Sequence, residues 1–162
     1  MRAFILGLGL LFVSLDAREI NLDKLIHKAS LSHKHLFVFL HKTHCGYCES
    51  MKEFTLQNSI VQSFIQKHFI YEHINIKKND SVTYQDFHGS AKEFAIDIGY
   101  NFYPTSLFFD DKGEVILAEV GYRDSVAEPN EKRFYKILHF IQSEAYKTMD
   151  MSEYKFEIDK EF

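Results

Sequence analysis

Hydrophobic positions along the chain first indicate strands. Residues 36–40 form a continuous apolar run of strand length, as a strand buried on both faces of a sheet requires. Residues 69–76 alternate apolar and polar side chains, and residues 105–109 and 114–120 are further apolar segments of strand length. The turn at residues 110–113, Asp-Asp-Lys-Gly, is a strong hairpin signal. The last two strands are therefore predicted to pair antiparallel.

Other segments repeat their apolar residues at helical spacing. Asn21 is the predicted N-cap of the first helix, and Asn58 or Ser59 caps the third. The segment 77–89 is polar and irregular, and we interpret it as a loop insertion. Five helices are predicted in this way, at about 22–29, 46–55, 59–65, 91–98 and 129–146.

The order of these elements defines the fold class. Helices separate the first two strands, so these strands are predicted to be parallel, whereas the hairpin adds antiparallel strands. The chain shows no internal repeat and no second domain. We therefore predict an α/β domain with a central mixed sheet flanked by helices.

The N-terminus has the pattern of a signal peptide. Arg2 precedes an apolar run at residues 3–15, and Ala17 supplies a small residue after it. The run is short for a membrane span, which needs about 20 residues. We expect residues 1–17 to be a cleaved signal peptide, residues 18–146 the domain, and residues 147–162 a charged C-terminal tail. An uncleaved N-terminal anchor and a buried N-terminal element are the alternatives. Export to the periplasm implies a compartment where disulfides persist.

Composition mainly excludes classes of function. A chain of 162 residues with 46% hydrophobic residues has about the size and content of one globular domain. A net charge of -4 provides no basic patch, so no nucleic acid partner is expected. Two cysteines exclude a multi-bridge scaffold and a four-cysteine metal site. Cys45 and Cys48 are therefore predicted to act as a pair.

The cysteine pair lies where the first strand leads into a helix. A thiolate of Cys45 at the helix N-terminus faces unpaired N–H groups and the positive end of the helix dipole, and such placement lowers a thiol pKa from ~8.5 to ~3.5–7.5. Cys48 is about one turn further and more buried, so it can resolve a mixed disulfide formed at Cys45. A protonated His44 further favours the thiolate, although His44 also fits a solvated loop residue.

These motifs together resemble the thioredoxin family. The strand and the motif His44-Cys45-Gly46-Tyr47-Cys48 are followed by Tyr103-Pro104-Thr105 directly before an apolar strand. The resemblance covers roughly residues 36–141 and implies a thioredoxin-like fold, with a cis proline at Pro104 whose loop lies against the cysteines. Within the family, the motifs look like small periplasmic thioredoxin-related proteins and the C-terminal domain of the transmembrane thiol:disulfide interchange reductase.

Two positions depart from the classical thioredoxins. Phe39 stands where those proteins have a buried aspartate that helps to deprotonate the second thiol, and His44 replaces a tryptophan. The proton route through that aspartate is therefore missing here.

The resemblance implies a thiol–disulfide oxidoreductase, an enzyme that acts on protein thiols and disulfides. Cys45 attacks and Cys48 releases the product. The redox-active disulfide Cys45–Cys48 itself carries the two electrons, so no organic cofactor or metal is expected. The resemblance leans towards a reductase fed by a membrane electron donor, and we expect the protein to be a monomer. The residues predicted to contact substrate are His44, Gly46, Tyr47, Tyr103, Pro104 and Thr105.

Other interpretations of the pair remain open. A purely structural disulfide would close a very small loop and stabilise the fold little. Cys45 and Cys48 with His41 or His44 offer the ligand types that copper or zinc accepts. Adjacent side chains such as those of His44 and Cys45 diverge, however, which disfavours a shared metal. Tyr47 and Tyr103 are interpreted either as an apolar rim for a partner or as simple packing.

Overall fold

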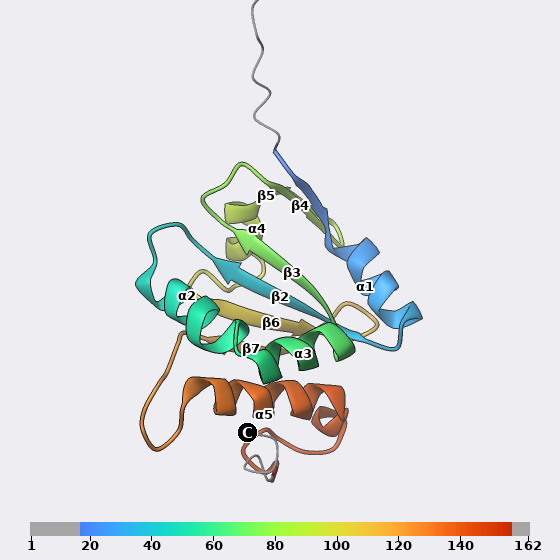
Figure 1. The fold of residues 1–162 in the computed structure, drawn as a ribbon. Helices are drawn as coiled ribbons and strands as arrows, with labels where there is room; N and C mark the ends of the chain where they lie inside the picture. Colours follow the sequence, from blue (N-terminus) through green and yellow to red (C-terminus); the bar gives the residue numbers. More distant parts are fainter. Residues whose placement is uncertain (1–16, 157–162) are drawn as a thin grey trace, which may run out of the picture.

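A four-stranded mixed sheet forms the centre of the computed structural model, which describes residues 17–156 (Figure 1). The strand order is β3 (Phe69–Asn75), β2 (His35–His41), β6 (Thr105–Phe109) and β7 (Val115–Val120). β2 pairs parallel with β3 and antiparallel with β6, and β6 pairs antiparallel with β7. The predicted mixed sheet, parallel first pair and hairpin are confirmed.

Helices cover both faces of this sheet (Figure 1). α1 and α4 pack on one face, together with the short strands β1 (Glu19–Asn21) and β4 (Ser81–Tyr84). The π-helix η1 that continues α2, and the helices α3 and α5, pack on the other face. The bounds are α1 (Leu22–Leu31), α2 (Gly46–Ser50), η1 (Met51–Leu56), α3 (Ser59–His68), α4 (Ala91–Asp97) and α5 (Asn130–Gln142).

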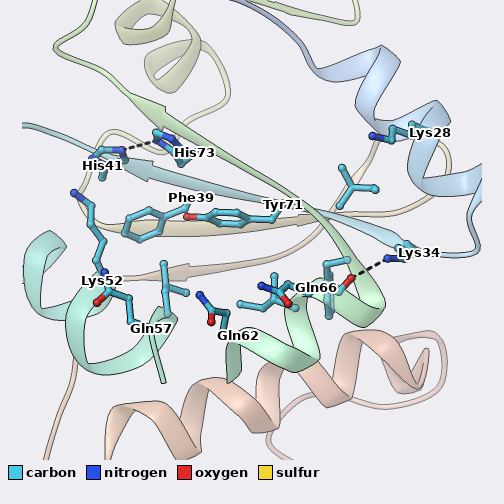
Figure 2. A pocket seen from close by; sticks show the side chains of 14 residues that line it. Lys28, Lys34, Phe39, His41, Lys52, Gln57, Gln62, Gln66, Tyr71 and His73 are labelled. Carbon is cyan, nitrogen blue, oxygen red and sulfur yellow. Dashed lines mark hydrogen bonds between the residues drawn. The ribbon is translucent and has the colours of Figure 1, made fainter. Parts of the chain in front are cut away.

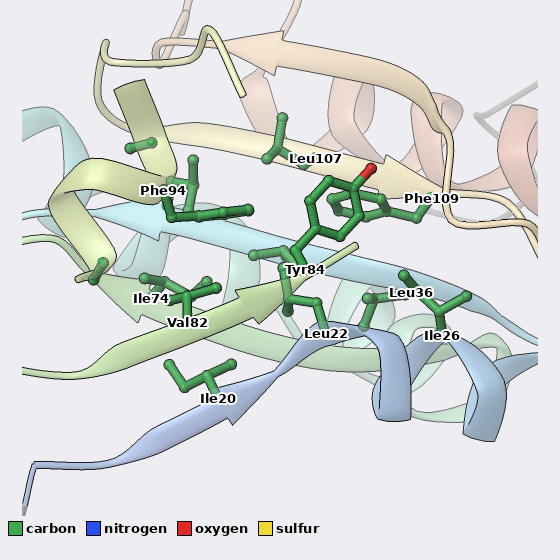
Figure 3. Packing of buried hydrophobic residues seen from close by; sticks show 14 of the residues in the cluster. Ile20, Leu22, Ile26, Leu36, Ile74, Val82, Tyr84, Phe94, Leu107 and Phe109 are labelled. Carbon is green, nitrogen blue, oxygen red and sulfur yellow. The ribbon is translucent and has the colours of Figure 1, made fainter. Parts of the chain in front are cut away.

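β2 divides the core into two halves because its side chains alternate between the faces of the sheet. Leu36, Val38 and Leu40 belong to one cluster, Phe37 and Phe39 to the other, and all five are fully buried. Figure 3 shows the first cluster, where side chains of the sheet meet those of α1, α4, β1 and β4, among them Ile20, Leu22, Ile26, Ile74, Val82, Tyr84, Phe94, Leu107 and Phe109. The apolar run at 36–40 is thus buried on both sides, as predicted.

The second cluster is built largely from phenylalanine rings. Phe108 of β6 stacks on Phe37 of β2, with ring centroids 4.9 Å apart. Phe69 and Phe134 lie against the same ring, at centroid distances of 5.9 and 6.2 Å. Phe108 therefore joins three structural elements, and its loss leaves a cavity that none of them can easily fill.

The predicted helix caps are also found. The side-chain oxygen of Asn21 accepts a hydrogen bond from the backbone N–H of Lys24 at 2.9 Å. Asn58, rather than Ser59, caps α3 by accepting hydrogen bonds from the N–H groups of Ile60 and Val61. Both side chains satisfy N–H groups that the first helical turn leaves unpaired.

The predicted loop insertion at 77–89 is wrong, because most of its second half is a hairpin. β4 (Ser81–Tyr84) and β5 (Phe87–Ser90) pair antiparallel, and β4 pairs parallel with β1 (Glu19–Asn21), forming a second, three-stranded sheet. Val82 and Tyr84 point into the core from β4. Two buried residues among polar neighbours form too short an alternation to predict a strand from sequence.

Two helices differ in detail from their predictions. The helix expected at 46–55 changes to π-helical geometry from Met51 onward. The final helix, expected to reach residue 146, ends at Gln142, and Glu144 then adopts a left-handed backbone with φ 58° before the 3₁₀ turn η2 (Ala145–Lys147). The apolar spacing continues through this break, which is why the sequence pattern did not reveal it.

The ends of the chain are described only in part. The proposed signal peptide lies outside the described residues except for residue 17. In the described part of the tail, the ring centroids of Phe156 and His139 are 4.1 Å apart, and those of Tyr154 and Phe140 are 5.1 Å apart. Phe156 and Tyr154 therefore pack on α5. Within residues 17–156, no helix has the length and apolar character needed to cross a membrane.

Candidate active site

Cys45 and Cys48 are joined in a disulfide where β2 leads into α2, with their Cα atoms 5.2 Å apart. Cys45 is the N-cap of α2, and its Sγ accepts a hydrogen bond from the backbone N–H of Cys48 at 3.2 Å. Cys45 keeps 7% of its surface exposed, whereas Cys48 is fully buried. The prediction that Cys45 opens the helix and that Cys48 is the more buried cysteine is confirmed.

This arrangement favours negative charge on Cys45 when the pair is reduced. The N–H group of Cys48 that now faces the sulfur also faces a thiolate at the same place, and the dipoles of the helical turns add to it. We therefore expect nucleophilic attack on a partner disulfide to start at Cys45, with Cys48 left to attack Cys45 in turn.

The loop before β6 lies against the Cys45 sulfur. The carbonyl oxygen of Tyr103 is 3.9 Å from Cys45 Sγ, and the Tyr103–Pro104 peptide bond is cis, as the resemblance implies. The Thr105 hydroxyl donates a hydrogen bond to the carbonyl of Phe102 at 2.6 Å. These contacts bring the cysteine pair and the proline loop together on one surface.

The six residues predicted to contact substrate differ in exposure. His44, Gly46 and Tyr47 are exposed, with 67% of Tyr47 accessible. Pro104 and Thr105 are buried, and the Pro104 carbonyl already accepts a hydrogen bond from the N–H of residue 121 at 2.7 Å. Pro104 and Thr105 thus shape the loop rather than face a partner with their side chains. Tyr103, the sixth residue, is half-buried.

Two further residues flank the site and were missed by the sequence analysis. Phe102 directly precedes the Tyr103–Pro104 bond and has 70% of its surface exposed. The ammonium of Lys42 lies over the Tyr103 ring, 5.8 Å from its centroid. Phe102 lies in an irregular segment with no neighbouring helix or strand to bury its ring. This position in the sequence could have predicted its exposure.

A buried polar contact supports the helix that carries Cys48. Asn130 at the start of α5 is fully buried, and its amide donates hydrogen bonds to Thr55 Oγ1 at 2.6 Å and to Met51 Sδ at 3.3 Å. Buried amides need such partners to offset their loss of water. The contact ties α5 to η1 directly behind the cysteine pair, and the sequence pattern did not indicate it.

Phe39 occupies the position at which classical thioredoxins have a buried aspartate, and a pair of histidines lies next to it. Phe39 is fully buried and stacks on His41, with ring centroids 5.4 Å apart. His41 Nε2 and His73 Nδ1 are 3.2 Å apart, so one ring donates a hydrogen bond to the other. Burial, reinforced by the charge of Lys52, lowers the pKa of His41 to about 4. Burial likewise lowers the pKa of His73.

Metal ligation was the alternative use of the cysteines and nearby histidines. Across the described part of the chain, no group of three or more His, Cys, Asp or Glu side chains lies close enough together to hold a metal ion. His41 instead pairs with His73, and both cysteine sulfurs are taken up by the disulfide.

We expect the His41 pair to make stability depend on pH. The folded pKa of about 4 lies below the ordinary value of 6.5, so the unfolded chain binds more protons between these values. The free energy of unfolding should therefore fall as the pH drops from 6.5 towards 4, and His41→Phe should remove roughly 1–3 kcal/mol of that fall. Urea unfolding at the two ends of this pH range measures it.

The control is His27→Phe, since His27 is exposed on α1. It should keep the wild-type pH dependence. An equal fall in stability for wild type and His41→Phe would contradict the assignment.

Solved structures with the same fold include two thioredoxin-type proteins. A thioredoxin-fold protein from Helicobacter pylori is 22% identical, with a TM-score of 0.59 and 80% of each chain covered. A thioredoxin from Thermus thermophilus is 18% identical, with a TM-score of 0.58, covering 87% of this chain and 98% of its own. The C-terminal domain of DsbD from Neisseria meningitidis is 14% identical, with a TM-score of 0.52, covering 73% and 91%. At these identities, the likeness shows the fold.

Sequence comparison supplies the family. A search of curated proteins finds no match to this chain. The model of the thioredoxin-like domain matches residues 22–141, which is most of the chain and includes both cysteines and the proline loop. The chain therefore belongs to the thioredoxin-like domain family, and its Cys45–Cys48 disulfide lies within the matched domain.

Proposed function

We propose that this protein exchanges thiols and disulfides with other proteins in the periplasm and works mainly as a reductase. The observation that carries the proposal is the position of Cys45, whose sulfur lies at the start of α2 and 3.9 Å from the Tyr103 carbonyl. Such a sulfur is accessible from one side, stabilised as a thiolate from the other, and adjacent to backbone that an extended partner segment can approach.

The reaction balances without a cofactor. The Cys45 thiolate attacks one sulfur of a substrate disulfide, forming a mixed disulfide and releasing the first substrate thiolate. The Cys48 thiolate then attacks Cys45 Sγ, closing the Cys45–Cys48 disulfide and releasing the second substrate thiolate. Two electrons pass from the cysteine pair to the substrate, and a dithiol donor must then reduce the pair again.

We propose that exposed aromatic side chains guide the substrate. Tyr47 lies between the two cysteines, and Phe102 lies next to the Tyr103–Pro104 bond, with both rings largely exposed. Aromatic rings at the rim of such a site bury apolar groups of a partner near the sulfur. His44 and Gly46 lie exposed beside Cys45 and complete this contact surface.

Location and electron donor are part of the same proposal. The pattern of residues 1–17 supports export, and the fold shared with the C-terminal domain of DsbD fits a donor held in the membrane. We propose a monomer. Fractionation of expressing cells, with a mass measurement of the recovered chain, should find a periplasmic protein that begins at Arg18.

The direction of electron flow is tested by the reduction potential of the pair. For a reductase, we expect equilibrium with glutathione or dithiothreitol buffers to give a value nearer about −270 mV than about −120 mV, the range that separates reducing from oxidising members of this fold. Alkylation followed by mass measurement gives the reduced fraction at each buffer ratio. A value near −120 mV would contradict the reductase assignment while leaving the exchange chemistry in place.

A further inference from the structure

A cavity of about 720 Å³ lies between the central sheet and the helices at the β3 edge (Figure 2). Phe39 and Tyr71 line it from β2 and β3, and Leu56 and Ile65 line it from η1 and α3. Neither cysteine and no residue of the Tyr103–Pro104 loop lines this cavity. Its size is that of sites for small organic ligands, and its apolar walls can cover the body of such a ligand.

Cationic side chains stand at both ends of the cavity. Figure 2 shows Lys52 near His41 and His73 at one end, and Lys28 and Lys34 at the other, with the aromatic rings between them. Among the described residues, no aspartate or glutamate lines the cavity. The chain as a whole has a net charge of -4, so this concentration of positive charge is local.

Several polar groups of the cavity keep unused capacity for hydrogen bonds. Lys34 Nζ donates one hydrogen bond, to the Gln66 carbonyl at 2.9 Å, and an ammonium has three donors. Lys52 pairs with Glu49 at 3.0 Å, but Glu49 is exposed and outside the cavity. His41 is 6% exposed, and its Nδ1 is buried without a hydrogen-bond partner. A buried polar atom of this kind needs a partner, and a ligand can supply one.

We propose that this cavity binds an organic anion with an apolar body. Tyr71, which is 43% exposed, contacts the aromatic or aliphatic body, while the lysines bind its carboxylate, sulfonate or phosphate group. The charge decides the class of ligand, because a cation is repelled from both ends and a neutral ligand carries no charge that the lysines attract. The inference is independent of the proposed thiol–disulfide activity, since it uses neither cysteine.

The charge preference is tested with two fluorescent probes of similar shape. We expect 8-anilinonaphthalene-1-sulfonate to bind the wild-type protein with a saturable one-to-one titration. Its uncharged analogue N-phenyl-1-naphthylamine should bind with an affinity at least about tenfold lower. The triple variant Lys28→Met, Lys34→Met, Lys52→Met should lose about tenfold or more of its affinity for the sulfonate and keep its affinity for the uncharged probe.

A matched variant controls for the change in net charge. Lys67, Lys92 and Lys112 are exposed and lie outside the cavity, so replacing these three by methionine changes the charge equally. This control should bind the sulfonate as the wild type does. Equal losses in both triple variants, or no saturable binding to the wild type, would overturn the proposal.

The position of the site is tested separately on α3. Gln62 lines the cavity, whereas its exposed neighbour Ser63 does not. Gln62→Trp places a large ring at the cavity and should reduce sulfonate binding about tenfold, whereas Ser63→Trp should leave it unchanged. Unchanged binding to Gln62→Trp, with unfolding midpoints equal to the wild type, would show that the probe binds elsewhere and would overturn the assignment.

Discussion

Cys45→Ser is expected to abolish the reduction of insulin by this protein, lowering the rate by about three orders of magnitude or more. A serine hydroxyl carries no thiolate and cannot form the mixed disulfide that begins the exchange. The aggregation of reduced insulin chains, followed by turbidity with dithiothreitol as the electron source, measures the rate above the background of dithiothreitol alone.

Cys48→Ser is the matched control, because it removes the same disulfide and leaves the attacking sulfur in place. Cys45 still attacks, but no second thiol releases the product, so a mixed disulfide with the substrate should accumulate and be visible by mass. A purely structural disulfide predicts that the two variants behave alike. Insulin reduction retained by Cys45→Ser, or an adduct that forms only in Cys45→Ser, would contradict the assigned roles.

Phe108→Ala should be among the most destabilising single substitutions in the domain, costing about 3–5 kcal/mol in the free energy of unfolding. Phe108 is fully buried and packs against the rings of Phe37, Phe69 and Phe134. Its removal leaves a cavity between a strand pair and α5 that the surrounding aromatic rings cannot close without moving the sheet. Urea unfolding followed by circular dichroism measures the loss.

Phe102→Ala provides the comparison within the same part of the chain. Phe102 is 70% exposed, so its loss should change the free energy of unfolding by less than about 0.5 kcal/mol. It should instead raise the KM for a protein disulfide while leaving that for a small disulfide unchanged. Similar stability losses for both variants would contradict the division between buried core and exposed rim.

Strong local patterns made much of the fold predictable. The run at 36–40 is apolar at every position because both faces of β2 are covered, which is a signature that a half-exposed strand does not have. Asn21 and Asn58 indicated helix starts through a side-chain chemistry that acts within three residues. The turn at 110–113 holds its hairpin in the same local way, since Asp110 accepts hydrogen bonds from the N–H groups of Lys112 and Glu114.

Features formed by distant segments were not predictable from local pattern. β4 and β5 have four residues each. β4 pairs with the three-residue strand β1, which lies about sixty positions earlier in the chain. The contact between Cys45 and Tyr103 was expected only through the resemblance to a family. Lys28, Lys34 and Lys52 of the cavity come from α1, the loop after it and η1. No regular spacing along the sequence relates these three positions.

The central claim, that the sulfur of Cys45 is the activated nucleophile at the start of α2, is tested most directly by alkylation of the reduced protein. The rate of iodoacetamide modification at each cysteine, measured by mass spectrometry of peptides across a pH series, should show Cys45 reacting well below about pH 8 and much faster than the buried Cys48. Slow modification of both cysteines at equal rates, rising only above about pH 8, would contradict the account.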